Sequence, residues 1–162
     1  MLTAILVTLV LGLARAQNPV VSFSAGLSHH QAFVADDNVV FDQVFINEGG
    51  AYSSTSGLFT CPVSGIYLFQ FHALSRESSN AWMELYHNAD YIASVFAHAE
   101  QDYASAGNSA IIKVTKGDTV YIKAVDATGY PVNLYGATDE VYNTFSGYLL
   151  APVFEEITPV GK

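Results

Sequence analysis

The chain has 162 residues, of which 51% are hydrophobic and 13% aromatic, and its formal net charge is −9. This composition excludes an intrinsically disordered chain, and the excess of acidic residues disfavours binding to nucleic acid or to anionic lipid. The single cysteine, Cys61, excludes an intrachain disulfide and leaves a buried thiol or an intermolecular bond.

Residues 1–16 have the pattern of a secretory signal peptide. The apolar residues 2–13 are followed by Ala14-Arg15-Ala16, a small-x-small cleavage signal. The apolar stretch is shorter than the roughly 20 residues that span a bilayer, so we expect a secreted protein without membrane insertion. A buried first strand is the alternative. Cleavage after Ala16 would leave residues 17–162 as a single domain, which keeps 5 of the 6 basic and all 15 acidic residues.

Short segments rich in aromatic and β-branched residues follow in chain order. In the most regular one, residues 65–71, large rings alternate with other residues, so Tyr67, Phe69 and Phe71 share one face of an extended strand. The ranges expected to form strands are 19–27, 39–45, 58–61, 63–74, 82–86, 91–96, 109–114, 119–125 and 144–151. We expect turns at 47–50, 53–57 and 87–90, a polar loop at 76–80, and a long exposed loop at 126–140 with or without a short strand.

Eight to ten short strands without a helical pattern predict an all-β sandwich or jelly roll. Several of these strands are apolar on both faces. Opposite the rings of the central strand lie Ile66 and Leu68, where a strand facing water would carry polar residues. A homo-oligomer would cover this second face, and the alternative is that loops or the C-terminal tail cover it.

One set of spaced residues resembles the signature of the globular head of complement C1q. Its positions are Phe41, Asn47, Tyr52, Phe59, Gly65, Tyr67, Phe69 and Phe71, and further matches occur at 106–110, 116–118 and 145–150. The resemblance covers about residues 20–152. It implies a ten-stranded jelly roll of the C1q and tumour necrosis factor superfamily, assembled as a homotrimer. A leader followed directly by a head is similar to secreted, lectin-like pattern-recognition proteins of innate immunity.

Saccharide ligands need aromatic faces together with planar carboxylates, amides or guanidinium groups. The loop after Val125 carries such groups, and Arg76 in another loop offers a partner for a sialate or another anion. The candidate ligand-binding residues are Arg76, Asp126, Tyr130, Asn133, Tyr135, Asp139, Glu140 and Tyr142. The alternative for each tyrosine is packing at the rim of the sandwich.

The resemblance also implies calcium as a candidate cofactor, because some members of that family hold it with acids in the stretch that matches residues 98–107, although Ala104 stands where those members have an Asp. Glu100 and Asp102 are the acids at that place and provide hard oxygen ligands. A solvated acidic loop is the alternative, since one chain supplies too few ligands. No catalytic motif is present, so we expect a protein that is not an enzyme.

Three functions remain open at this point. The first is a secreted, trimeric recognition protein that binds glycans or microbial surfaces through its loops. The second is a trimeric ligand for a protein receptor. The third is an acidic, calcium-binding protein of body fluid or matrix.

Overall fold

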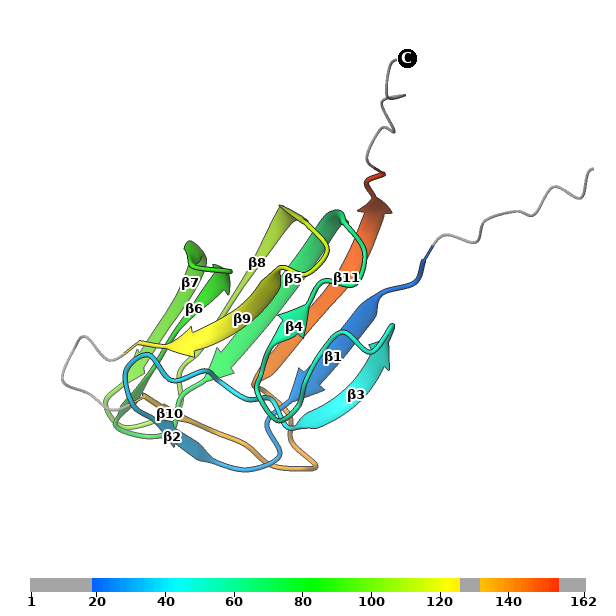
Figure 1. The fold of residues 1–162 in the computed structure, drawn as a ribbon. Helices are drawn as coiled ribbons and strands as arrows, with labels where there is room; N and C mark the ends of the chain where they lie inside the picture. Colours follow the sequence, from blue (N-terminus) through cyan, green and yellow to red (C-terminus); the bar gives the residue numbers. More distant parts are fainter. Residues whose placement is uncertain (1–18, 126–131, 155–162) are drawn as a thin grey trace, which may run out of the picture.

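The computed structural model describes residues 19–125 and 132–154, so the predicted signal peptide lies outside the described residues. The described part is all-β, as the sequence predicts, and Figure 1 shows its strands in two layers. The strands are β1 (Ser22–Gly26), β2 (Gln31–Phe33), β3 (Gln43–Glu48), β4 (Phe59–Thr60), β5 (Gly65–Leu74), β6 (Ser79–His87), β7 (Asp90–Ala99), β8 (Ser105–Val114), β9 (Thr119–Ala124), β10 (Val132–Leu134) and β11 (Thr144–Pro152).

The two layers are a five-stranded and a six-stranded sheet. The first sheet has the order β3-β1-β11-β5-β8, with antiparallel pairs throughout. The second sheet has the order β2-β10-β6-β9-β4, and β7 pairs with β6. Apart from the β6–β7 hairpin, neighbouring strands are not consecutive in the sequence, which is the arrangement of a jelly roll. No helix in the described part is long and apolar enough to cross a membrane.

Several predicted boundaries are wrong. Asn47 and Glu48, predicted to lie in a turn, end strand β3, because they pair with Phe23 and Ser22 of β1. Strand β8 begins at Ser105, four residues earlier than predicted, and the polar loop after Arg76 ends earlier because Ser79 already belongs to β6. Strand β2 was not predicted. Its three residues pair only with β10, a partner about 100 residues away in the chain.

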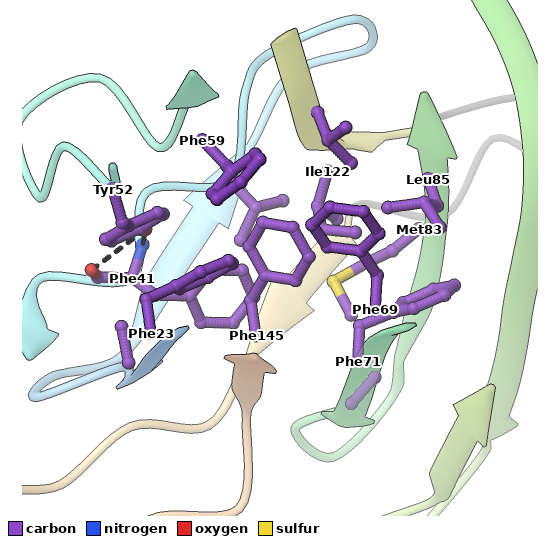
Figure 2. Packing of buried hydrophobic residues seen from close by; sticks show 14 of the residues in the cluster. Phe23, Phe41, Tyr52, Phe59, Phe69, Phe71, Met83, Leu85, Ile122 and Phe145 are labelled. Carbon is purple, nitrogen blue, oxygen red and sulfur yellow. Dashed lines mark hydrogen bonds between the residues drawn. The ribbon is translucent and has the colours of Figure 1, made fainter. Parts of the chain in front are cut away.

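The core lies between the two sheets and is dominated by rings (Figure 2). Phe23 lies 4.7 Å from Tyr52 in a parallel stack and 4.9 Å from Phe145 edge to face. Phe59 meets Phe69 edge to face at 5.3 Å. All five side chains are buried. Since burying one large apolar side chain contributes about 1.5–3 kcal/mol, this cluster is the main source of the stability of the fold.

The residues of the C1q-like signature hold each other through polar contacts as well as packing. The hydroxyl of Tyr52 donates to the carbonyl of Phe41 and accepts from its amide, both at 3.1 Å (Figure 2). The Asn47 side chain donates to the Tyr52 carbonyl at 2.8 Å and accepts from the Tyr52 amide at 3.1 Å. The gaps between Phe41, Asn47 and Tyr52 are therefore set by four hydrogen bonds that close the chain after β3.

The outer face of the first sheet carries one apolar row, as the two-sided pattern indicates, beside polar residues such as Gln70 and Ser109. Strand pairing places Tyr148 of β11, Leu68 of β5 and Ile111 of β8 in one row across the sheet. Tyr148 is 41% and Ile111 is 64% exposed, so no described segment covers this row. A groove of about 510 Å³ between Val20, Ile46 and Tyr148 continues the same face towards the β3 edge.

Candidate functional site

Three loops meet at one end of the sandwich, the lower end in Figure 1. They connect β5 to β6, β7 to β8, and β10 to β11. Main-chain hydrogen bonds join them: the Ser75 amide donates to Ala104 at 2.8 Å, the Arg76 amide to Asn133 at 3.0 Å, and the Tyr135 amide to Leu74 at 3.0 Å. Residues far apart in the sequence are thereby brought together on a supported backbone.

Two buried polar side chains pin these loops. Asn143, only 1% exposed, accepts from the Leu74 amide at 2.9 Å and donates to the carbonyls of Leu74, at 3.2 Å, and Tyr135. The Ser75 hydroxyl, also buried, accepts from the Ala104 amide at 3.1 Å. Buried polar groups that are fully paired in this way rigidify the segments they join.

The first hollow at this end is the tyrosine pocket, which we define by its lining residues. Its volume is about 400 Å³ and carbon atoms form most of its surface. The ring of Tyr135 meets the rings of Tyr103 and Tyr142 edge to face, each at 5.7 Å between centroids and at 86° and 72° between planes. The lining residues are Leu74, Tyr103, Tyr135, Glu140 and Tyr142.

The second hollow is the polar pocket, of about 250 Å³, lined by Arg76, Glu77, Tyr103 and Asn133. Tyr103 lines both hollows, so the two adjoin at this residue. Among the described residues the ion pairs join His29 to Asp42, His87 to Asp118 and Lys123 to Asp36, and none of them includes Arg76. Its guanidinium is thus open to a ligand.

Tyr135 is held from two sides. Its hydroxyl donates to a Glu140 carboxylate oxygen at 2.8 Å, and this bond raises the pKa of Tyr135 above its ordinary value. The His30 ring lies 4.7 Å from the Tyr135 ring, and its Nδ1 accepts from the amide of Gly136 at 2.9 Å. A Cβ on Gly136 would lie 2.1 Å from the His29 carbonyl oxygen, so this residue must be glycine for the chain to pass so closely.

The structure brings together five of the eight predicted ligand-binding residues. Arg76 and Asn133 line the polar pocket, and Tyr135, Glu140 and Tyr142 line the tyrosine pocket. Asp139 is exposed and lines neither of the two. Asp126 and Tyr130 lie outside the described residues.

Sequence reasoning missed Leu74, Glu77 and Tyr103, which also line the pockets. Leu74 has the pattern of a core residue at the end of a strand. Tyr103 follows Asp102 directly, in the loop that was considered only for calcium. An aromatic residue in an acidic, exposed loop was the available signal.

The candidate calcium ligands lie in the same β7–β8 loop. Glu100 and Asp102 are both exposed, and one carboxylate oxygen of Asp102 accepts from the Tyr103 amide at 2.8 Å. Within residues 19–125 and 132–154 no group of three His, Cys, Asp or Glu side chains is placed to hold a metal ion. Because calcium takes six to eight oxygen ligands, a single described chain does not complete a site.

The fold is a jelly-roll β-sandwich of the kind shared by C1q and tumour necrosis factor domains. The globular domain of zebrafish complement 1qA superposes with a TM-score of 0.61 at 24% identity, over 82% of this chain and 99% of that chain. Eiger TNF from S. frugiperda superposes with a TM-score of 0.66 at 12% identity, over 87% and 99%. Identities this low establish the fold alone.

The sequence itself assigns the family. The family model described as the C1q domain matches residues 22–150, and the chain belongs to the C1q domain family. Its relatives include the collagen alpha-1(X) chain of Mus musculus, 31% identical over 136 residues, and caprin-2 of Danio rerio, 32% identical over 133 residues. The aligned regions are 83% and 80% of this chain but only 19% and 14% of those proteins. The chain thus spans less than a fifth of the length of either relative.

Proposed function

We propose that this protein is a secreted recognition protein that binds glycans or related surface patterns through the two adjoining pockets. The observation that carries the proposal is the meeting of three tyrosine rings, an amide and an unpaired guanidinium at one supported end of the sandwich. Exposed binding residues on loops held by a rigid β-scaffold are typical of recognition domains.

The tyrosine pocket and the polar pocket would contact different parts of the ligand. Ring faces pack on the apolar face of a ligand, while Arg76 and Asn133 supply a planar cation and an amide for directed hydrogen bonds. Saccharide rings carry both kinds of surface. Asp126 and Tyr130 remain predicted contacts, and so does Asp139, which belongs to the same predicted loop.

A glycan array and a panel of microbial wall preparations test the proposal. Wild-type protein is expected to bind a subset of these glycans and wall preparations. The variants Arg76→Gln and Tyr142→Leu are expected to lose most of that binding. Glu48→Gln, on the exposed end of β3, is the matched surface control and should bind as wild type. Failure on every sugar and wall, together with capture of one cell-surface receptor, would favour the alternative of a receptor ligand.

Assembly into a homotrimer is the second part of the proposal. The apolar row of Tyr148, Leu68 and Ile111 and the adjoining groove give one sheet an outer face that another copy would bury. Repeated pockets on one particle would raise the avidity for surfaces with repeating ligands.

Sedimentation equilibrium measures the assembly directly. Ile111→Glu should shift the protein from trimer to monomer, because it introduces a charge into the apolar row. Tyr91→Glu is the control: Tyr91 is 54% exposed, but it lies on β7 of the second sheet. A wild-type protein that sediments as a monomer would contradict this part of the proposal.

Calcium and secretion complete the proposal. Glu100 and Asp102 would contribute to a calcium site only where several copies bring their β7–β8 loops together, and calorimetry in millimolar calcium measures that binding.

Secretion requires the predicted signal peptide at residues 1–16, followed by a single domain at 17–162. Expression in cultured cells should place the protein in the medium with Gln17 as its first residue.

A further inference from the structure

The tyrosine pocket is lined by rings that stand nearly at right angles to each other. Tyr103 and Tyr142 each meet the Tyr135 ring, with interplanar angles of 86° and 72°, and Leu74 adds aliphatic surface. A group inside the pocket therefore meets aromatic surface from several directions.

The charge of the pocket has one sign. Among the described residues that line it, Glu140 is the only charged one, and its carboxylate accepts one hydrogen bond, from Tyr135, while forming no ion pair with a described residue. The whole chain carries −9, which adds to the negative potential. The faces of aromatic rings also attract cations. The pocket is therefore suited to a cation and not to an anion.

The surface of the pocket restricts that cation further. Most of its lining is carbon, and the polar side-chain groups of its described lining residues are the Glu140 carboxylate and the tyrosine hydroxyls. A primary ammonium group that enters this carbon-lined hollow loses part of the hydration of its three N–H donors. A quaternary ammonium group has no N–H to satisfy, and its methyl groups pack on ring faces.

We propose that the tyrosine pocket binds a quaternary ammonium group of the choline type. The inference rests on the proposed function, since it names the ligand chemistry of the same site. A phosphate joined to the choline would reach the adjoining polar pocket, which shares Tyr103, and meet Arg76 and Asn133 there. Glu77 lines that pocket too and opposes the anion, so the cation contributes most of the affinity.

Calorimetric titration of the full chain tests the proposal with four probes: tetramethylammonium, choline, phosphocholine and phosphoethanolamine. The first three are expected to bind, with phosphocholine within about tenfold of choline. Phosphoethanolamine should bind at least about tenfold more weakly, because it keeps the phosphate and the charge but lacks the methyl groups.

Substitutions locate the binding. Glu140→Gln keeps an acceptor for the Tyr135 hydroxyl, removes the charge and should weaken choline binding about tenfold. Glu48→Gln removes an acid outside both pockets and should change nothing. Tyr142→Leu should weaken choline binding, and Tyr142→Phe, which keeps the ring, should bind choline more tightly than Tyr142→Leu does. Equal affinity for phosphocholine and phosphoethanolamine, or wild-type choline binding by Glu140→Gln, overturns the proposal.

Two further binding measurements distinguish a lipid from a saccharide as the carrier of the choline group. Phosphatidylcholine vesicles and a polysaccharide that carries phosphocholine present the same group on a lipid and on a saccharide. Retention on either, released by free choline, supports the pocket, and retention that choline does not release contradicts it. Binding of a choline-free polysaccharide without any binding of quaternary ammonium refutes this inference and leaves the proposed function standing. If the protein binds neither a polysaccharide nor a quaternary ammonium compound, both this inference and the proposed function are refuted.

Discussion

Asn143 offers a direct test of how the sandwich supports its pockets. Replacing it by alanine removes the partner of the Leu74 amide and of the Tyr135 carbonyl, both inside the protein. The Leu74 carbonyl keeps a partner, because it also accepts from the Tyr135 amide at 3.0 Å. Two buried groups are thus left without a hydrogen bond, at a cost of about 1–3 kcal/mol each.

Asn143→Ala is therefore expected to lower the free energy of unfolding by about 3 kcal/mol. For a domain of this size that corresponds to a fall in Tm of about 6–12 °C. Leu74 and Tyr135 both line the tyrosine pocket, so ligand binding should weaken along with stability.

Urea unfolding at one fixed protein concentration provides the measurement, because assembly would make stability depend on concentration. Asn133→Ala is the matched control. Asn133 contributes its main-chain carbonyl to Arg76 and Ser79, which alanine retains, and the variant should remain within about 0.5 kcal/mol of wild type. A loss for Asn143→Ala no larger than that of the control would refute the role assigned to Asn143.

Three further outcomes follow from the structure. Gly147→Ala should destabilise the protein by about 1–3 kcal/mol in urea unfolding, because a Cβ there would lie 2.6 Å from the Phe69 ring and 2.7 Å from the Phe23 ring; a stable variant would mean that these rings move aside. Hydrogen bonds from Asn88, His87 and the Thr115 amide lower the pKa of Asp118 to about 2, so its contribution to stability is complete above about pH 4 and is lost as the pH falls towards 2. Thermal unfolding against pH should decline less steeply over that window in Asp118→Asn than in wild type, and parallel curves would contradict the assignment. Burial raises the pKa of the Cys61 thiol, so a thiol reagent at pH 8 should label it only after unfolding in urea; rapid labelling of the native protein would show that the thiol is accessible.

The features that sequence reasoning predicted are those with a local signal. Alternating rings in residues 65–71 require a strand with one aromatic face, and Tyr67, Phe69 and Phe71 are all fully buried. The hairpin turning at 87–90 follows from a polar cluster between two apolar runs, and β6 and β7 pair across it. The all-β class and the two-sided apolar pattern depend on the same short-range periodicity.

The features that it missed depend on contacts between distant residues. Tyr103 and Tyr135 are 32 positions apart, and only the joining of the β7–β8 and β10–β11 loops through Ser75 and Leu74 brings their rings to 5.7 Å. The pairing of β2 with β10 is of the same kind. For Tyr135, Glu140 and Tyr142, residue type in a loop was sufficient to nominate them, but not to place them around one pocket.

The four hydrogen bonds that fasten Tyr52 to Phe41 and Asn47 also bear on how this protein can evolve. They involve none of the side chains that line the two pockets, and Tyr103 and Tyr142 leave about half of their surface in water, at 47% and 51% exposed. Under the proposed function, changes at these rim positions would alter specificity while the folding framework stays intact. Duplicated copies of such a chain would be free to diversify their targets one rim residue at a time, whereas the spacing of Phe41, Asn47 and Tyr52 would persist in every descendant.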